Sequence, residues 1–241
     1  MSMSLTPRRL AILSFHKIGL PPPQGWETWS YISEESFVGH LTYLRNNRWH
    51  VIDLATFLDG LTSPESLPER AVLLTFDDGY RSILDGARRR LLQFGYPAVV
   101  FVPTDFIGGR NTFDTGIEPE EAICDWDDLL ELERCGVSVQ SHGASHRQFS
   151  KLTRAEQELE MRRSKRVLEA HLGKRVEIFC YPYGDGGTEP RTVRAALQRA
   201  GYRAACLYGG GPVPLPIRDP YRLTRVAMGP DSDLHNEIEE E

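Results

Sequence analysis

The sequence has few of the features that mark several common protein classes. Only 4 of its 241 residues are cysteine, and none of them forms a C-x-x-C pair, which argues against a zinc knuckle or a dithiol redox motif. No apolar stretch approaches the roughly 20 residues needed to span a bilayer. The apolar run at residues 10–15 is too short for the core of a secretory signal peptide. The sequence as it stands therefore predicts a cytoplasmic protein, although an exported protein whose signal peptide had been removed would look the same.

Long runs of lysine and arginine are also absent. The formal net charge is -6 and the sequence pI is about 5.7. Because a nucleic-acid backbone requires a basic face, we expect no nucleic-acid partner. The sequence contains no internal repeat and identifies no protein partner. Apolar residues make up 40% of the chain and charged residues 26%, which is typical of a globular protein with a buried core.

The sequence contains instead a regular alternation of short apolar runs with stretches of helical spacing. Ser33 can cap a helix, Thr153 and Glu156 can form a capping box, and Gly173 suits a helix C-terminus. Strands that alternate with helices predict a parallel sheet covered by helices. About eight such units favour a closed or nearly closed βα barrel, in which the chemistry gathers at the C-terminal ends of the strands. The expected strands are residues 10–15, 51–52, 72–76, 98–102, 137–140, 176–180, 202–206 and 223–226.

The expected strand at residues 72–76 ends in a pair of carboxylates. It leads directly into Asp77 and Asp78, and Gly79 permits a tight exit from the strand. Because neighbouring residues of an extended chain point in opposite directions, one carboxylate can bind an ion while the other faces water or substrate. A polar turn with an aspartate cap is the alternative interpretation.

Two further strand ends carry residues suited to the same chemistry. Residues 137–140 are followed by His142 and His146, and imidazoles at positions i and i+4 of a helical turn can share one ion. Two histidines and one aspartate leave an open coordination position, as catalytic zinc sites do. Residues 176–180 are followed by Tyr181-Pro182-Tyr183-Gly184. Such a turn can direct a backbone N–H outward while an aromatic ring forms a wall, although a plain β-turn is common for these residues.

These three motifs together resemble the first three motifs of the polysaccharide deacetylase family, also called NodB-like or carbohydrate esterase family 4. Their order and separations match, and so does the whole region from about residue 10 to residue 227. The resemblance implies an α/β fold, namely an irregular (β/α)7 barrel, formed by a single catalytic domain over residues 1–241 with its core at about 10–228. It also implies a metal-dependent hydrolase that removes N-acetyl groups from a saccharide containing N-acetylhexosamine.

The resemblance, carried over by position, assigns a role to each motif residue. Asp78, His142 and His146 would hold one divalent ion, Asp77 would be the general base, and the Tyr183 backbone N–H would help to hold the oxyanion. Zinc suits a site of two histidines and one carboxylate, and nickel or cobalt would fit nearly as well. Trp26 and Trp29 could also stack on sugar rings, with loop packing as the alternative. The side chains expected to contact the sugar are Tyr181, Pro182, Tyr183 and Trp126.

Two positions depart from the family pattern. Many members carry an arginine, which partners the base, at the position of Cys180; Arg222 or Arg225 at the last expected strand could replace it. The C-terminal Leu-His-Asp motif that supplies the acid histidine is missing, because His235 follows no apolar strand. The first strand ends instead in His16, which resembles the circularly permuted subgroup that begins with Tyr-His and includes poly-N-acetylglucosamine deacetylases. We therefore predict that His16 is the general acid; a histidine that closes a barrel strand by bonding to backbone is the alternative.

Two other functions are compatible with the same residues. The superfamily includes amide and imide hydrolases that act on small nitrogen compounds, and a fold does not determine a substrate. A cytoplasmic location would favour such a substrate, or a nucleotide- or lipid-linked sugar. The barrel could also be an inactive sugar-binding or scaffolding module, but the presence of both aspartates and both histidines argues against this.

Overall fold

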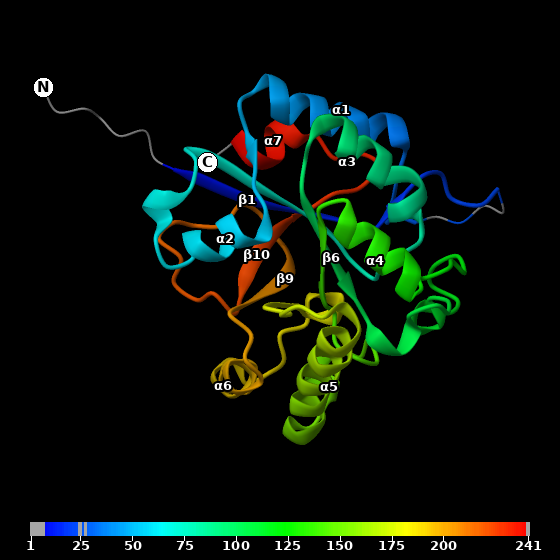
Figure 1. Cartoon of the computed structure of the whole chain (residues 1–241), viewed down its shortest axis with the longest axis vertical. Helices are drawn as coiled ribbons and strands as arrows, with labels where there is room; N and C mark the ends of the chain where they lie inside the picture. Colours follow the sequence, from blue (N-terminus) through cyan, green and yellow to red (C-terminus); the bar gives the residue numbers. More distant parts are fainter. Residues whose placement is uncertain (1–7, 24–25, 27, 240–241) are drawn as a thin grey trace, which may run out of the picture.

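A computed structural model describes residues 8–23, 26 and 28–239 of the chain (Figure 1). Seven parallel strands form a closed barrel in the order β1-β10-β9-β8-β7-β6-β5, and β5 pairs back with β1. The irregular (β/α)7 barrel that the sequence predicts is therefore confirmed. The barrel strands are β1 (Arg9–Phe15), β5 (Arg70–Phe76), β6 (Ala98–Val102), β7 (Val137–Ser141), β8 (Ile178–Cys180), β9 (Ala204–Gly210) and β10 (Leu223–Ala227).

Three short strands lie beside the barrel. β4 (His50–Val51) pairs with the first half of β5, while the second half of β5 pairs with β6. β2 (Lys17–Ile18) follows β1 and pairs with β3 (Tyr31–Ile32) in a separate small sheet. The barrel strands run from Arg9 to Ala227, and the single domain over residues 1–241 stays a prediction.

Helices cover the outside of the barrel, with α1 and α7 near one end of the view in Figure 1 and α5 and α6 near the other. Their ends follow the expected signals: Ser33 accepts from the Ser36 N–H, Thr153 and Glu156 form a capping box, and Gly173 ends α5. None of the helices within the described ranges is long and apolar enough to cross a membrane. The helices are α1 (Glu34–Asn46), α2 (Leu54–Gly60), α3 (Arg88–Phe94), α4 (Trp126–Arg134), α5 (Arg154–Leu172), α6 (Pro190–Ala200) and α7 (Leu234–Glu239).

The alternation of side chains along each strand creates two separate apolar layers. On β1, Leu10 and Ile12 belong to the buried cluster inside the barrel, whereas Leu13 and Phe15 belong to the cluster between the barrel and its helices. This alternation determines which residues at the strand ends point into the mouth of the barrel. Asp77, for example, lies in line with Leu73 of the inner layer and is itself buried.

Candidate active site

A pocket of about 360 Å³ opens at the mouth of the barrel, where the C-terminal ends of the strands meet. Its walls come from the ends of β1, β5, β7, β8 and β9, from the segment before β3, and from the long β6–α4 loop, residues 103–125. Among the described residues, those that line the pocket include four carboxylates and three histidines but no lysine or arginine. They are His16, Trp29, Ser30, Asp77, Asp78, Tyr80, Asp114, Ile117, Glu118, His142, His146, Tyr183, Gly184 and Tyr208.

Asp78, His142 and His146 place three potential ligand atoms next to one another. Asp78 Oδ1 lies 3.3 Å from His142 Nε2 and 3.0 Å from His146 Nε2, and all three side chains are buried. Among the residues that the structure describes, Asp78 Oδ1 has no hydrogen-bond partner. A buried carboxylate oxygen without a bond is costly, and a divalent cation among the three atoms would compensate it. The donor set of two imidazoles and one carboxylate fits zinc, nickel or cobalt.

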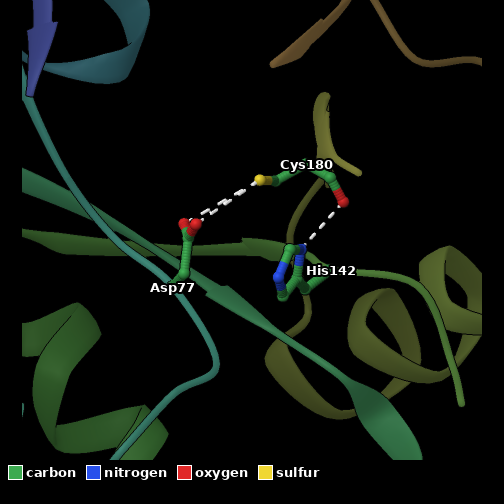
Figure 2. Close-up of side chains that lie close together, drawn as sticks. All are labelled: Asp77, His142 and Cys180. Carbon is green, nitrogen blue, oxygen red and sulfur yellow. Dashed lines mark hydrogen bonds between the residues drawn. The ribbon is translucent and has the colours of Figure 1, made fainter. Parts of the chain in front are cut away.

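A contact of the His142 ring determines which of its nitrogens can bind a cation. His142 Nδ1 lies 2.8 Å from the Cys180 backbone oxygen (Figure 2). Because a carbonyl oxygen can only accept, Nδ1 must carry the proton, and in the neutral ring Nε2 keeps its lone pair. Metal-binding histidines commonly have such a partner for their second nitrogen. The ring is thus oriented with its free nitrogen toward Asp78.

The backbone conformation that brings these ligands together differs in part from the one that the sequence pattern predicts. Residues 142–146 form a loop after β7 rather than the helical turn that we expected for an i, i+4 pair. Gly143 and His146 both have positive φ, 78° and 53°, and Asp78 has a φ of 67°. A non-glycine residue in this region costs on the order of 1–3 kcal/mol. Two of the three candidate ligands therefore hold a strained backbone.

A second group of potential ligands lies nearby but does not fit a metal ion. Ligand atoms of Asp77, His142 and Cys180 lie within 4.8 Å of one another, and Figure 2 shows the Cys180 thiol directed at Asp77. However, Arg225 Nη2 lies 2.7 Å from Asp77 Oδ2 and 3.0 Å from Cys180 Sγ. Burial raises the pKa of the Cys180 thiol to about 11, so the thiolate that a metal requires is scarce at neutral pH. The Arg225 guanidinium already supplies a positive charge to Asp77, so the Asp78 group is the candidate metal site.

Arg225 binds Asp77 from the last barrel strand. Its Nη1 and Nη2 donate to Asp77 Oδ1 and Oδ2 at 2.8 and 2.7 Å, and its side chain is fully buried. Burial opposes ionisation of Asp77, but the charge and hydrogen bonds of Arg225 outweigh it and hold the pKa of this carboxyl below its ordinary value. Of the two arginines that the sequence offers as replacements, Arg225 thus reaches Asp77, whereas the Arg222 guanidinium lies beside Gly186.

His16 lies in the pocket at the end of β1. Its Nε2 is 3.9 Å from Asp77 Oδ2, and its ring contacts Tyr208 edge to face, with 5.4 Å between centroids. Its Nδ1 is buried without a hydrogen-bond partner in the described part of the chain. This argues against the alternative in which His16 only closes the strand by bonding to backbone. His235, by contrast, lies on α7 and contacts Tyr43. The structure thus places His16 beside Asp77, while its role as the acid stays a prediction.

Tyr183 forms part of the pocket wall, as its motif indicates. Its φ is 56°, its ring lies 4.6 Å from that of His146, and its hydroxyl donates to Asp114 Oδ1 at 3.1 Å. The side chain is half-exposed. The ring is therefore available to a ligand, and the role of the backbone N–H stays a prediction.

Tyr181 and Pro182 do not line the pocket, which corrects the prediction that they contact a sugar. Cys180 belongs to the layer inside the barrel, so strand alternation directs Tyr181 outward. There it is buried against Phe149 and Phe179, and Pro182 is buried beside it. Both residues have packing roles.

The predicted contact of Trp126 with a sugar is also corrected. Trp126 begins α4 and stacks on His171 of α5, with 3.9 Å between ring centroids, so it lies with the outer helices and not in the pocket. Trp29, by contrast, lines the pocket and is partly exposed. Its Nε1 donates to Asp231 at 2.6 Å, which fixes the ring in place. Trp26 is not among the lining residues.

Several pocket residues are missed by motif analysis because they lie outside the motifs. Asp114 and Glu118 come from the β6–α4 loop, and Tyr208 comes from β9. Burial and the nearby Asp78 carboxylate raise the pKa of Asp114. Tyr208 could have been found from parity, because Cys206, two residues earlier, belongs to the layer inside the barrel. For Asp114 the only signal is a loop longer than the connection requires.

The buried ion pair gives a first prediction. An Arg225→Gln variant leaves Asp77 buried without its cation, and we expect the free energy of unfolding to fall by about 3–5 kcal/mol at pH 7. Arg222→Gln, the control, should stay within about 0.5 kcal/mol of the parent. Urea unfolding with a chelator measures both.

The pH dependence of this difference has a defined sign. The depressed pKa of Asp77 stabilises the parent above the ordinary carboxyl pKa of about 4, and this contribution is lost on acidification. In Arg225→Gln the carboxyl protonates more readily, so the gap between variant and parent should narrow below that pH. Equal stabilities at pH 7 would contradict the ion pair.

Comparisons of the sequence with known proteins identify its family. The family model described as polysaccharide deacetylase matches residues 65–205. YxkH of Bacillus subtilis (strain 168), named as a polysaccharide deacetylase, is 26% identical over 226 residues, which cover 93% of this chain and 73% of that protein. The poly-beta-1,6-N-acetyl-D-glucosamine N-deacetylase of Escherichia coli (strain K12) is 31% identical over 108 residues. That match covers 42% of this chain and only 16% of the Escherichia coli protein.

Solved structures share the fold at low sequence identity. The Streptococcus pyogenes deacetylase PplD, solved in complex with acetate, has a TM-score of 0.84 and 20% identity, and the match covers 98% of this chain and 100% of that one. IcaB from Ammonifex degensii has a TM-score of 0.76 and 24% identity, with 94% of each chain covered. These likenesses show the fold, and the family model covers more than half of the chain. The chain therefore belongs to the polysaccharide deacetylase family.

Proposed function

We propose that this protein is a metal-dependent N-deacetylase that releases acetate from an N-acetylhexosamine-containing saccharide. The observation that carries the proposal is the convergence, in one pocket, of a three-atom donor set and a separate buried carboxylate. Asp78, His142 and His146 form the donor set, and Asp77 is bound by Arg225 beside it. Membership of the polysaccharide deacetylase family supports the same chemistry.

The proposed reaction is the hydrolysis of an acetamide. The oxygen of a water molecule bonds to the acetyl carbon, the bond from that carbon to nitrogen breaks, and acetate and a free amine result. When bound, a divalent ion would acidify the attacking water and polarise the acetyl carbonyl. Asp77 would accept the proton of the water, and its partner Arg225 favours the ionised carboxylate that can do so.

Two further groups of the pocket would complete the reaction. The Tyr183 backbone N–H would donate to the oxyanion, a kind of contact typically worth about 3–4 kcal/mol. His16 would protonate the leaving nitrogen, a task that suits histidine at neutral pH. Its position beside Asp77, with Nε2 3.9 Å from that carboxylate, supports this role.

The pocket walls support a neutral saccharide as the substrate. Trp29, Tyr183 and Tyr208 present partly exposed rings to the pocket, and aromatic faces bind the apolar side of sugar rings. No lysine or arginine is among the lining residues that the structure describes, so the pocket offers no free cation to a phosphate-linked sugar. The printed name of the Escherichia coli relative, a poly-beta-1,6-N-acetyl-D-glucosamine N-deacetylase, makes a β-linked polymer the first substrate to test.

Metal removal and base replacement test the proposal together. Chelation should abolish acetate release from β-linked N-acetylglucosamine oligomers, and zinc, nickel or cobalt should restore it. Asp77→Asn should keep its metal and lose activity by about 10²–10⁴-fold, because the substitution removes the proton acceptor and leaves all three donor residues in place. Asp78→Ala should lose the metal as well. Acetate release and metal content measure these effects.

Two outcomes would overturn the proposal. Hydrolysis of cyclic imides without acetate release from any acetylated sugar would favour the small-amide hydrolases of the same superfamily. Absence of bound metal together with absence of activity in the parent would favour a sugar-binding module.

A separate experiment tests the acid. His16→Asn should lower kcat by about 10²-fold or more while metal content is unchanged, because the substitution removes only the proposed proton donor. His235→Asn is the matched control, because His235 lies on α7 and contacts Tyr43. Near-normal turnover of His16→Asn would remove the assignment.

A further inference from the structure

Asp114 is a nearly buried carboxylate that none of the family motifs includes. It ends the short helical turn Thr112–Asp114 in the β6–α4 loop and is 8% exposed. Its Oδ1 accepts a hydrogen bond from the Tyr183 hydroxyl at 3.1 Å. Across the described residues it forms no ion pair, and it belongs to neither group of potential metal ligands. The hydrogen bond from Tyr183 is therefore the contact that points to the role of the Asp114 carboxylate.

Tyr183 occupies a turn that cannot be held by ordinary backbone preference. Its φ of 56° lies in the left-handed region, which is unfavourable for a residue with a side chain. On the next residue, Gly184, a Cβ atom would lie 2.7 Å from the Tyr208 backbone nitrogen, so the turn lies directly against β9. The Tyr183 side chain is 46% exposed. Because packing covers only about half of this side chain, the hydrogen bond of its hydroxyl to Asp114 can help to fix the conformation of the turn.

The β6–α4 loop is a firm anchor for that contact. Asn111, three residues before Asp114, is buried and donates to the Pro119 carbonyl at 2.9 Å while accepting from the Glu121 N–H at 2.7 Å. These bonds close the loop on itself. The Phe113 ring lies 4.0 Å from the ring of His146, so the residue before Asp114 also packs against a candidate ligand.

The other side of the same loop is fixed by a buried cation. Glu118 accepts from Lys17 Nζ at 2.8 Å, and Lys17 is 1% exposed. Thr28 and Ser30 donate to the same carboxylate, at 2.6 and 2.7 Å. Asp114 and Glu118 thus tie the loop to the end of β8 on one side and to the segment after β1 on the other.

We propose that Asp114 is a positioning residue that holds the Tyr183 backbone N–H in the orientation needed to bind the oxyanion. It acts through the Tyr183 hydroxyl, and a hydrogen bond to a carboxylate is stronger than one to a neutral acceptor. The proposal rests on the proposed deacetylase function, because that reaction provides the oxyanion. Asp114 would add a residue of the β6–α4 loop to catalytic machinery whose other members follow the ends of barrel strands.

A double-mutant cycle tests the proposal on the full-length, metal-loaded protein. Asp114→Ala and Tyr183→Phe should each lower kcat by about 10–100-fold, with smaller changes in KM and with bound zinc unchanged. The double variant should be no slower than the slower single variant, because both substitutions remove the same hydrogen bond between the Tyr183 hydroxyl and Asp114. Asp114→Asn should recover most of the rate, because its amide oxygen can still accept from the hydroxyl. Glu120→Gln, an exposed carboxylate of the same loop that pairs with Arg110, is the matched control.

A second measurement does not depend on catalysis. The amide resonance of Tyr183 in an ¹⁵N-correlated spectrum should shift in Asp114→Ala and not in Glu120→Gln. Loss of zinc from Asp114→Ala, multiplicative effects in the double variant, or an unshifted Tyr183 amide would overturn the proposal. If the parent releases no acetate from any substrate while the Tyr183 amide still shifts, the proposed function fails and the Asp114 contact stands.

Discussion

The site depends on three electron-pair donors that are held close together where little water can reach them. Asp78 Oδ1 lies 3.3 Å from His142 Nε2 and 3.0 Å from His146 Nε2, and this carboxylate oxygen has no hydrogen bond within the described chain. Asp78 and His146 both have a left-handed backbone. Such an arrangement is unfavourable by itself, and a bound cation would stabilise it. The closed barrel makes it possible, because its strand ends cannot move apart independently.

Two adjacent aspartates have different environments in this site. Asp78 faces imidazoles, whereas Asp77 is bound at both oxygens by a buried guanidinium. Neighbouring carboxylates can take different roles when their surroundings differ. The guanidinium comes from β10 and reaches Asp77 past the small side chain of Cys180, 3.0 Å from its sulfur. Because the barrel is closed, an arginine on more than one strand can reach Asp77. The arginine that partners Asp77 therefore need not come from the third motif.

The sequence predicts the barrel, and its motifs identify the aspartates and histidines that lie together at the barrel mouth, because both features depend on local patterns. Apolar runs identify the strands, and residues that follow these runs lie at one end of the barrel. The alternation of side chains along a strand carries further information. Cys180 points into the barrel, so Tyr181 must point away from it, into the apolar layer between the barrel and its helices. The prediction that Tyr181 contacts a sugar fails because it assigns all residues of the motif to the pocket, although neighbouring residues of a strand point in opposite directions.

Other features depend on contacts between distant residues and have no local signal. The positive φ of His146 replaces the expected helical turn, and nothing in residues 142–146 except Gly143 indicates it. Arg225 reaches Asp77 because β10 pairs with β1 in the closed barrel, and these two strands are far apart in the sequence. Asp114 meets Tyr183 only because the β6–α4 loop folds back over the mouth of the barrel, which is a property of the whole chain.

A crystal soaked in zinc and measured on both sides of the zinc absorption edge would show directly whether these three atoms hold a metal ion. We expect one strong anomalous peak at the mouth of the barrel, about 2.0–2.2 Å from Asp78 Oδ1 and from the Nε2 atoms of His142 and His146. A zinc ion held by Asp77 and Cys180 with Arg225 displaced, or no ion in the pocket at saturating zinc, would contradict this expectation.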